Sequence, residues 1–213
     1  MRVLLLILAQ VLAIGTAWPV SADQVVIDFE SLTGMWYASR QPIPVEARLS
    51  DQLVSTYGVR FSSGSPYVAV VNLGIGHATS GSNGIGGSTA DGRLTYAATP
   101  PLEFSFWDPN ATTVEAVTDY VALRLDQFAT SDGRTVTLTA YDLSGAVIGS
   151  VTVADAAGAL IAIEAVGIHR VAFFGCGDDD GAALDDLSFH PLVPVGPTSI
   201  RRRSIGSVKV HYR

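Results

Sequence analysis

Short runs of apolar residues, most of them alternating with polar ones, recur along residues 23–193. The clearest run is 134–141, in which valine, leucine and alanine alternate with threonines. Side chains two positions apart share one face of a strand, so this alternation predicts a strand with one buried and one exposed face. The turn residues 143–146 follow it, and they predict a hairpin with a second strand at 147–153.

The same pattern predicts strands throughout this stretch of chain. They are expected at 25–30, 59–61, 67–73, 94–97, 102–107, 120–128, 159–164, 168–174 and 184–189. Helical spacing occurs over residues 46–55, where Leu49, Leu53 and Val54 recur, and it predicts one short helix. Many short strands at regular spacing with almost no helix predict an all-β fold in which two antiparallel sheets form a sandwich.

Residues 72–92 interrupt the strand pattern with a run rich in glycine and serine. This composition predicts a long ordered surface loop rather than regular structure, and it does not follow the phosphate-binding patterns. Long loops on rigid scaffolds often bind ligands. The polar side chains of Asn72, His77 and Asn83 are therefore candidate ligand contacts.

Acidic residues interrupt two of the predicted strands, one near each end of the domain. Asp28 and Glu30 follow the apolar start of the first strand, and Asp185 and Asp186 lie inside the last. Because side chains alternate along a strand, one of the two adjacent aspartates must share a face with Leu187, and a buried carboxylate needs a partner. This pattern suggests that the two strands meet and that a cation joins them.

Three short motifs carry a resemblance to a known family. They are Asp-Phe-Glu at 28–30, Tyr-Gly-Val-Arg-Phe-Ser at 57–62 and Leu-Asp-Asp-Leu-Ser-Phe at 184–189. The chain resembles bacterial secreted domains of the galactose-binding-like or carbohydrate-binding-module type, as found in exported PEP-CTERM proteins. The resemblance covers nearly all of 23–193, and it implies a two-sheet antiparallel jelly-roll β-sandwich.

The resemblance also implies a structural calcium held by a glutamate of the first strand and an aspartate of the last. Calcium takes six to eight oxygen ligands, and Glu30 and Asp185 are the best candidates, with Asp28 and Asp186 next. Which aspartate of the pair binds stays open. The alternative is that these carboxylates are solvated or accept backbone N–H groups. The acidic run 178–180 is better interpreted as a solvated turn.

Five aromatic residues are candidates for stacking on sugar rings: Trp36, Tyr37, Tyr67, Tyr96 and Trp107. Trp36 and Tyr37 lie in an irregular segment, where a large aromatic side chain is less easily explained as core. Trp107 ends a predicted strand, and it is as readily a core residue as a ligand contact. These positions favour a binding surface for extracellular polysaccharide or cell-surface glycan.

Catalytic patterns are weak. The sequence contains no Gly-x-Ser-x-Gly motif, and its four histidines lack the His-x-x-x-His spacing typical of zinc sites. The favoured hypothesis is a calcium-stabilised, non-catalytic binding or cell-surface module directed at carbohydrate. The alternatives are a polysaccharide lyase or glycoside hydrolase on a jelly-roll scaffold, and a structural matrix protein without a small ligand.

The two ends of the chain differ from the domain between them. Residues 1–22 show a basic start, an apolar run and a small-residue cleavage site before Asp23, which predict a cleaved signal peptide and an extracellular protein. Residues 194–213 form a basic tail, expected to be flexible, and no stable membrane insertion is predicted. The single cysteine, Cys176, excludes an intrachain disulfide. A formal net charge of −7 argues against nucleic acid and is compatible with divalent cations.

Overall fold

The computed structural model describes residues 23–36, 38, 40–62, 67–95, 101–127, 135–175 and 183–196. The predicted signal peptide, Tyr37, Tyr96, Cys176, the acidic run 178–180 and the basic part of the tail lie outside the described residues. Among the described residues, no helix is long and apolar enough to cross a membrane.

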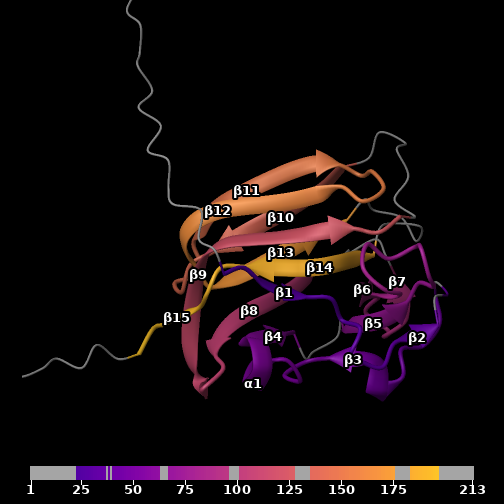
Figure 1. Ribbon diagram of the computed structural model, residues 1–213, viewed down its shortest axis with the longest axis horizontal. Coiled ribbons are helices and arrows are strands. Elements are labelled where there is room, and N and C mark those ends of the chain that lie inside the picture. The colour runs from indigo at the N-terminus through magenta and orange to yellow at the C-terminus, as the bar shows by residue number, and fades with distance from the viewer. Residues whose placement is uncertain are drawn as a thin grey trace, which may run out of the picture.

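One group of strands forms an antiparallel sheet, termed the five-stranded sheet. From one edge to the other its strands are β11 (Val147–Ala154), β10 (Thr135–Tyr141), β13 (Arg170–Phe174), β8 (Leu102–Asp108) and β4 (Val59–Phe61). β10 and β11 pair as the predicted hairpin, and they lie together at one side of the molecule (Figure 1). The alternation of the sequence therefore places one set of side chains of this sheet inside and the other outside.

The remaining strands form the second sheet. Its five main strands, in the order in which they pair, are β12 (Leu160–Ile168), β9 (Ala111–Leu125), β14 (Leu184–Phe189), β6 (Asn83–Ser88) and β5 (Val68–Asn72). Shorter strands pair with members of this set: β1 (Val25–Ile27), β2 (Met35–Trp36), β3 (Arg48–Leu49), β7 (Leu94–Thr95) and β15 (Val193–Pro194). β2 runs parallel to β5, whereas the other pairings are antiparallel. β9 also pairs with β8 across a tight connection, so it links the two sheets.

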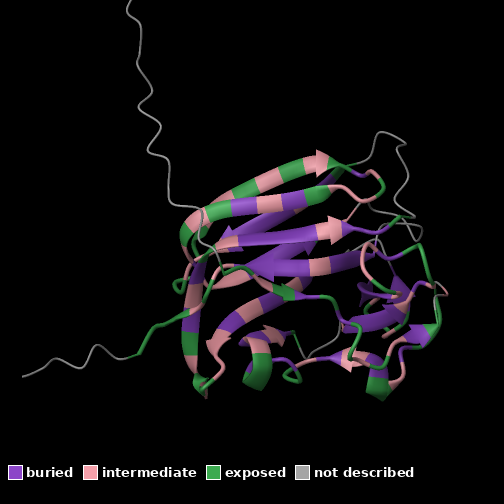
Figure 2. Cartoon of the chain, viewed as in Figure 1, coloured by how far each residue is buried: buried purple, intermediate pink, exposed green. Residues whose placement is uncertain are grey.

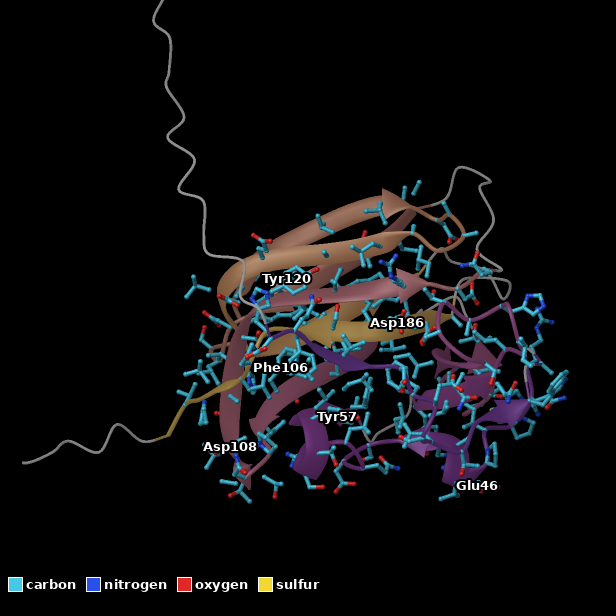
Figure 3. All side chains as sticks on the ribbon, viewed as in Figure 1. Glu46, Tyr57, Phe106, Asp108, Tyr120 and Asp186 are labelled. Carbon is cyan, nitrogen blue, oxygen red and sulfur yellow. The ribbon has the colours of Figure 1, made fainter. Side chains whose placement is uncertain are left out.

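The two sheets enclose one main hydrophobic core, as the buried strand faces in Figure 2 show. Phe106 of β8 and Phe189 of β14 meet across it, with their ring centroids 5.1 Å apart. Phe61 and Phe104 continue the aromatic contacts, with centroids 5.6 Å apart. Figure 3 shows Phe106 in the interior between the sheets. The predicted all-β sandwich is confirmed.

The predicted helix over residues 46–55 is wrong. The chain instead forms a 3-10 turn, η1 (Val45–Ala47), then β3, and then the single-turn helix α1 (Val54–Tyr57). Leu49 is buried, but it pairs with Val68 of β5, because sheet pairing outweighs weak local helix propensity. Gly58 ends α1 in the left-handed conformation, with φ of 72°.

The prediction of irregular structure throughout 72–92 is also wrong, because Asn72 ends β5 and residues 83–88 form strand β6. All residues of β6 are buried. A Cβ at Gly84 would lie 2.8 Å from the Leu184 carbonyl oxygen, so glycine allows β6 to approach the backbone of β14. In addition, β9 begins at Ala111, well before the predicted start at residue 120.

Candidate functional site

The two strands near which the acidic residues lie, β1 and β14, run side by side. β1 pairs with β14 in antiparallel register, with Ile27 opposite Leu187 and Val25 opposite Phe189. The prediction that the two acid-bearing strands meet is therefore confirmed. The pairing places the acidic residues that follow β1 and those at the start of β14 at the same end of the two strands, where Figure 3 shows Asp186.

Asp185 is completely buried. Its Oδ2 accepts a hydrogen bond from the Ser80 backbone N–H at 2.7 Å, and its Oδ1 accepts one from the Asp186 N–H at 2.7 Å. Burial raises the pKa of Asp185 from 3.8 to about 6, although these hydrogen bonds oppose the increase. The negative charge of Asp186 raises that pKa further. Asp185 thus fastens the Gly-rich segment to β14 at Ser80.

Glu30, in the turn that follows β1, holds the same segment. Its Oε1 accepts hydrogen bonds from the backbone N–H groups of Ser82 at 2.8 Å and of Asn83 at 2.5 Å. Gly81, between these anchor points, has a φ of 54°, and a Cβ there would overlap the Glu30 carboxyl carbon. Glu30 and Asp185 therefore both accept backbone N–H groups of residues 80–83. This is the alternative to calcium binding that the sequence analysis gave for these carboxylates.

The other two predicted metal ligands lie close by. Asp28 Oδ1 accepts a hydrogen bond from the Glu30 backbone N–H at 3.1 Å. Asp186 is half-buried and has a left-handed backbone, with φ of 46°. Within the described ranges, no group of three or more acidic, histidine or cysteine side chains is placed to hold a metal. The carboxylates of Glu30 and Asp185 have the donor chemistry that calcium prefers, and calcium binding stays a prediction.

The loop of residues 73–82 is fastened at several further points. Asn72 Oδ1 accepts the Gly74 N–H at 3.0 Å, and the Leu73 N–H donates to the Ser82 carbonyl at 2.7 Å. The His77 carbonyl accepts the Gln127 N–H at 2.8 Å, which ties the middle of the loop to the end of β9. The loop is therefore built by short-range and long-range backbone hydrogen bonds.

Asn83, predicted as a ligand contact, points inward. Only 6% of it is exposed, and its Nδ2 donates to the carbonyl oxygens of Phe29 at 3.2 Å and Leu32 at 3.1 Å. This side chain joins β6 to the turn that follows β1. It supports the site without facing solvent.

An exposed surface borders this loop, and it is termed the Trp36 surface: Trp36, Asn72, Ile75 and His77. Trp36 of β2 lies opposite Asn72 in the parallel pairing with β5, and 71% of it is exposed. Ile75 in the loop is 94% exposed, and His77 is also exposed. β2 and the end of β5 lie at one end of the molecule (Figure 1). The structure thus places two predicted ligand contacts, Trp36 and Asn72, opposite each other, and His77 and Ile75 lie in the loop that follows Asn72.

Trp107 lies elsewhere, on the outer face of the five-stranded sheet. The Arg60 guanidinium carbon lies 3.8 Å from the centroid of its ring, and Trp107 Nε1 donates to Ser105 Oγ at 2.9 Å. One face of the indole is therefore covered by a cation. The sequence reasoning missed Arg60, because a single arginine in a strand carries no signal until its cross-strand neighbours are known.

A pocket of about 230 Å³ lies between Tyr67, Ser88 and Glu103. It is smaller than the roughly 300–1,000 Å³ usual for small-molecule sites. It also lies toward the start of β5, whereas the Trp36 surface lies at the end of that strand. An extended ligand lying on the Trp36 surface would not need this pocket.

No family model matches the chain, and no curated protein matches it significantly. Among solved structures, a DUF4465 family protein from Bacteroides caccae aligns with a TM-score of 0.41 and 16% identity, over 81% of this chain and 99% of that one. A carbohydrate-binding module of Cellvibrio mixtus lichenase 5A, in complex with cellotriose, aligns with a TM-score of 0.28 and 15% identity, over 72% and 98%. Arabinose-bound MgGH51 α-L-arabinofuranosidase gives 0.33 and 13%, over 76% and 29%. Similarities at this level do not assign a family to the chain.

Proposed function

We propose that this protein is an exported, non-catalytic binding module directed at carbohydrate, and that Trp36 contacts the ligand. The observation that carries the proposal is the 71% exposure of Trp36 beside an ordered loop. Large aromatic side chains are usually at least partly buried, because their transfer from water is favourable. A free indole face at a loop-lined edge suits stacking against the apolar face of a sugar ring.

The loop beside Trp36 is organised before any ligand arrives. Asp185 accepts the Ser80 N–H, and Glu30 accepts the Ser82 and Asn83 N–H groups. Ordering a loop during binding costs free energy, so a loop already held by its own hydrogen bonds retains more of the contact energy as affinity. Asn72 and His77 add polar groups of the kind that bind hydroxyls.

Calcium belongs to the proposal as a structural ion. Glu30 and Asp185 would hold it, with oxygen ligands of the type that calcium prefers. A cation beside Asp185 would favour its ionised form and so oppose the effect of burial on its pKa. The role of these two residues toward carbohydrate is to position the loop rather than to touch the ligand.

The geometry favours binding over hydrolysis at this surface. Hydrolysis of a glycosidic bond generally needs two carboxyl groups that flank the bond. The Glu30 and Asp185 carboxylates accept backbone N–H groups of the loop, and Asp185 is inaccessible to solvent. Asp185 is therefore out of reach of a ligand, and Glu30, although exposed, has Oε1 committed to two backbone N–H groups of the loop.

The proposal is tested by binding of the mature protein to a broad set of soluble and insoluble glycans in millimolar calcium. Stacking contributes about 1 kcal/mol beyond buried area, so Trp36→Ala should weaken binding about tenfold or more. Trp36→Phe should retain part of the affinity because it keeps an aromatic face.

Val166→Ala is the matched control, since Val166 is 80% exposed on β12, a strand that does not border the Trp36 surface. It should bind as the wild type does. If the wild type binds no glycan with calcium present, the carbohydrate assignment is wrong. If Trp36→Ala binds as well as the wild type, the assignment of the site is wrong.

A further inference from the structure

A row of polar and aromatic side chains crosses the outer face of the five-stranded sheet. Arg60 of β4 lies opposite Ser105 of β8, Ser105 lies opposite Arg170 of β13, and Arg170 lies opposite Tyr141 of β10. Residues directly opposite one another in paired strands share a face of the sheet. Adjacent strands are about 4.8 Å apart, so the row is roughly 15 Å long.

Both arginines of the row are held flat against aromatic rings. The Arg60 guanidinium carbon lies 3.8 Å from the Trp107 ring centroid, and that of Arg170 lies 3.8 Å from the Tyr141 ring centroid. Stacking restrains the guanidinium and leaves N–H groups at its edge free to donate, so little side-chain freedom remains to be lost on binding. This arrangement presents two preorganised cationic groups on one surface.

The two guanidinium groups differ in their partners. Arg170 forms an ion pair with Glu103, with 2.7 Å between Nη1 and Oε1. Arg60 donates instead to the Thr112 backbone carbonyl at 3.0 Å, which is a neutral partner. The charge of Arg170 is therefore balanced locally, whereas the contacts that hold Arg60 leave its charge uncompensated.

Hydroxyl groups extend the same face beyond the row. Thr137 and Thr152 Oγ1 atoms are 2.9 Å apart, and Thr139 Oγ1 lies 3.2 Å from Ser150 Oγ. Ala172, fully buried between Thr139 and Glu103, gives the centre of the face a small side chain. The face thus combines cations, aromatic rings and paired hydroxyls, which together suit a ligand rich in both carboxylate and hydroxyl groups.

We propose that this face is a second binding site, and that it takes a carboxylate-bearing polysaccharide lying across the strands along the Arg60–Tyr141 row. Planar guanidinium groups match carboxylates in shape and charge. Two arginines separated by roughly two strand spacings suit a chain that repeats its acidic groups. Among the described residues Arg60 forms no ion pair, and an unbalanced positive charge on a chain with a net charge of −7 favours an anionic ligand over a neutral one. The proposal is independent of the Trp36 surface, which lies on other strands.

The direct test uses the mature wild-type protein with polygalacturonate and with the fully methyl-esterified form of the same polymer. Esterification removes the charge and keeps the sugar chain. Binding to polygalacturonate should be about tenfold tighter than to the ester, and it should weaken as ionic strength rises. Alginate, a second uronate polymer, should also bind. Equal binding of the acid and the ester, or binding of neither uronate polymer, would overturn the proposal, as would binding of sulfated dextran alone.

Variants locate the site. Arg60→Gln should weaken uronate binding on the order of threefold to tenfold, and Arg60→Lys should weaken it less because it keeps the charge. Glu103→Gln removes the carboxylate that competes for Arg170, so it should strengthen binding about threefold. Trp36→Ala should leave uronate binding unchanged. An unchanged affinity in both Arg60→Gln and Glu103→Gln would refute this location, and thermal melting establishes that each variant is folded.

Discussion

Asp185 and Ser80 are 105 residues apart in the chain, and the Asp185 carboxylate accepts the Ser80 backbone N–H at 2.7 Å. This contact connects strand β14 of the second sheet with the loop of residues 73–82. It depends on a buried carboxylate, which is costly unless it is hydrogen-bonded. The contact therefore couples the stability of the domain to the order of its proposed ligand-binding loop.

Asp185→Ala should disorder this loop and destabilise the domain. The substitution leaves the N–H groups of Ser80 and Asp186 without their acceptor, and an unsatisfied buried donor costs about 1–3 kcal/mol. Urea unfolding should show that loss, and hydrogen exchange of the Ser80 amide should accelerate. Glu164→Ala, an exposed acid on β12, is the control and should change neither. Normal protection of Ser80 in Asp185→Ala would contradict the anchoring role.

The free energy of unfolding should depend on pH in a way that reflects the protonation of Asp185. Its pKa is raised by burial to about 6, so between about pH 4 and 6 the folded state binds a proton that the unfolded state releases. The contribution of Asp185 to stability is therefore favourable at low pH and falls as pH rises through that window. Asp185→Asn removes this contribution.

The measurement is the difference in unfolding free energy between wild type and Asp185→Asn from pH 4 to 7, in chelator. Carboxylates distant from Asp185 contribute equally to both proteins, so the difference reports Asp185 together with its interaction with the adjacent Asp186. The wild type should lose stability relative to the variant as pH rises. A difference that stays constant with pH would contradict a raised pKa.

Gly81→Ala should be more damaging than an ordinary glycine substitution. Gly81 has a φ of 54°, and its added Cβ would overlap the Glu30 carboxyl group, whereas Gly145, with a φ of 81°, has open space around it. Both substitutions carry the cost of a left-handed backbone, about 1–2 kcal/mol. Gly81→Ala should cost more, because it also disrupts Glu30. Thermal melting compares them, and combining Gly81→Ala with Glu30→Ala should remove the excess. Equal costs for the two single variants would argue against the close contact.

Calcium should stabilise the wild type if Glu30 and Asp185 bind it in the folded state alone. Stabilisation by such a ligand reaches about 2.7 kcal/mol at a hundredfold excess over its Kd, and extracellular calcium sites can have a Kd of roughly 0.1–1 mM. Millimolar calcium should therefore raise the melting temperature visibly. Asp185→Ala should abolish the shift, and Glu164→Ala should retain it. If chelator leaves the melting temperature of the wild type unchanged, the proposal that calcium binds is wrong.

The sequence predicted those features that depend on local alternation. The threonine–aliphatic alternation of β10 places its side chains as observed, because a strand has only two faces. The pairing of β1 with β14 was also predictable, because a carboxylate buried in an apolar strand costs free energy unless a partner is near. The hydrogen-bond donors to those carboxylates, which are backbone N–H groups within residues 80–83, could not be predicted from any local sequence pattern.

The missed features depend on contacts between distant residues. β6 is rich in glycine and has low strand propensity, yet Gly84 fits against the Leu184 backbone where a larger residue would not. Leu49 has helical spacing with its neighbours but pairs with β5. The row through Arg60 and Arg170 arises from cross-strand register, which the sequence of a single strand does not contain.

The central claim is that carbohydrate lies against Trp36, and the fluorescence of Trp36 tests it most directly. In a chain produced from Asp23 onward, the start that the predicted signal-peptide cleavage would give, Trp36 and Trp107 are the two tryptophans, so Trp107→Phe leaves Trp36 as the sole indole emitter. At 71% exposure its emission should be typical of an indole in water, and a stacked sugar should remove that water. Titration with the tightest neutral glycan found in the binding screen should shift the emission to shorter wavelength, with the same midpoint as binding measured by calorimetry. Saturating glycan that leaves the Trp36 emission unchanged would contradict the account.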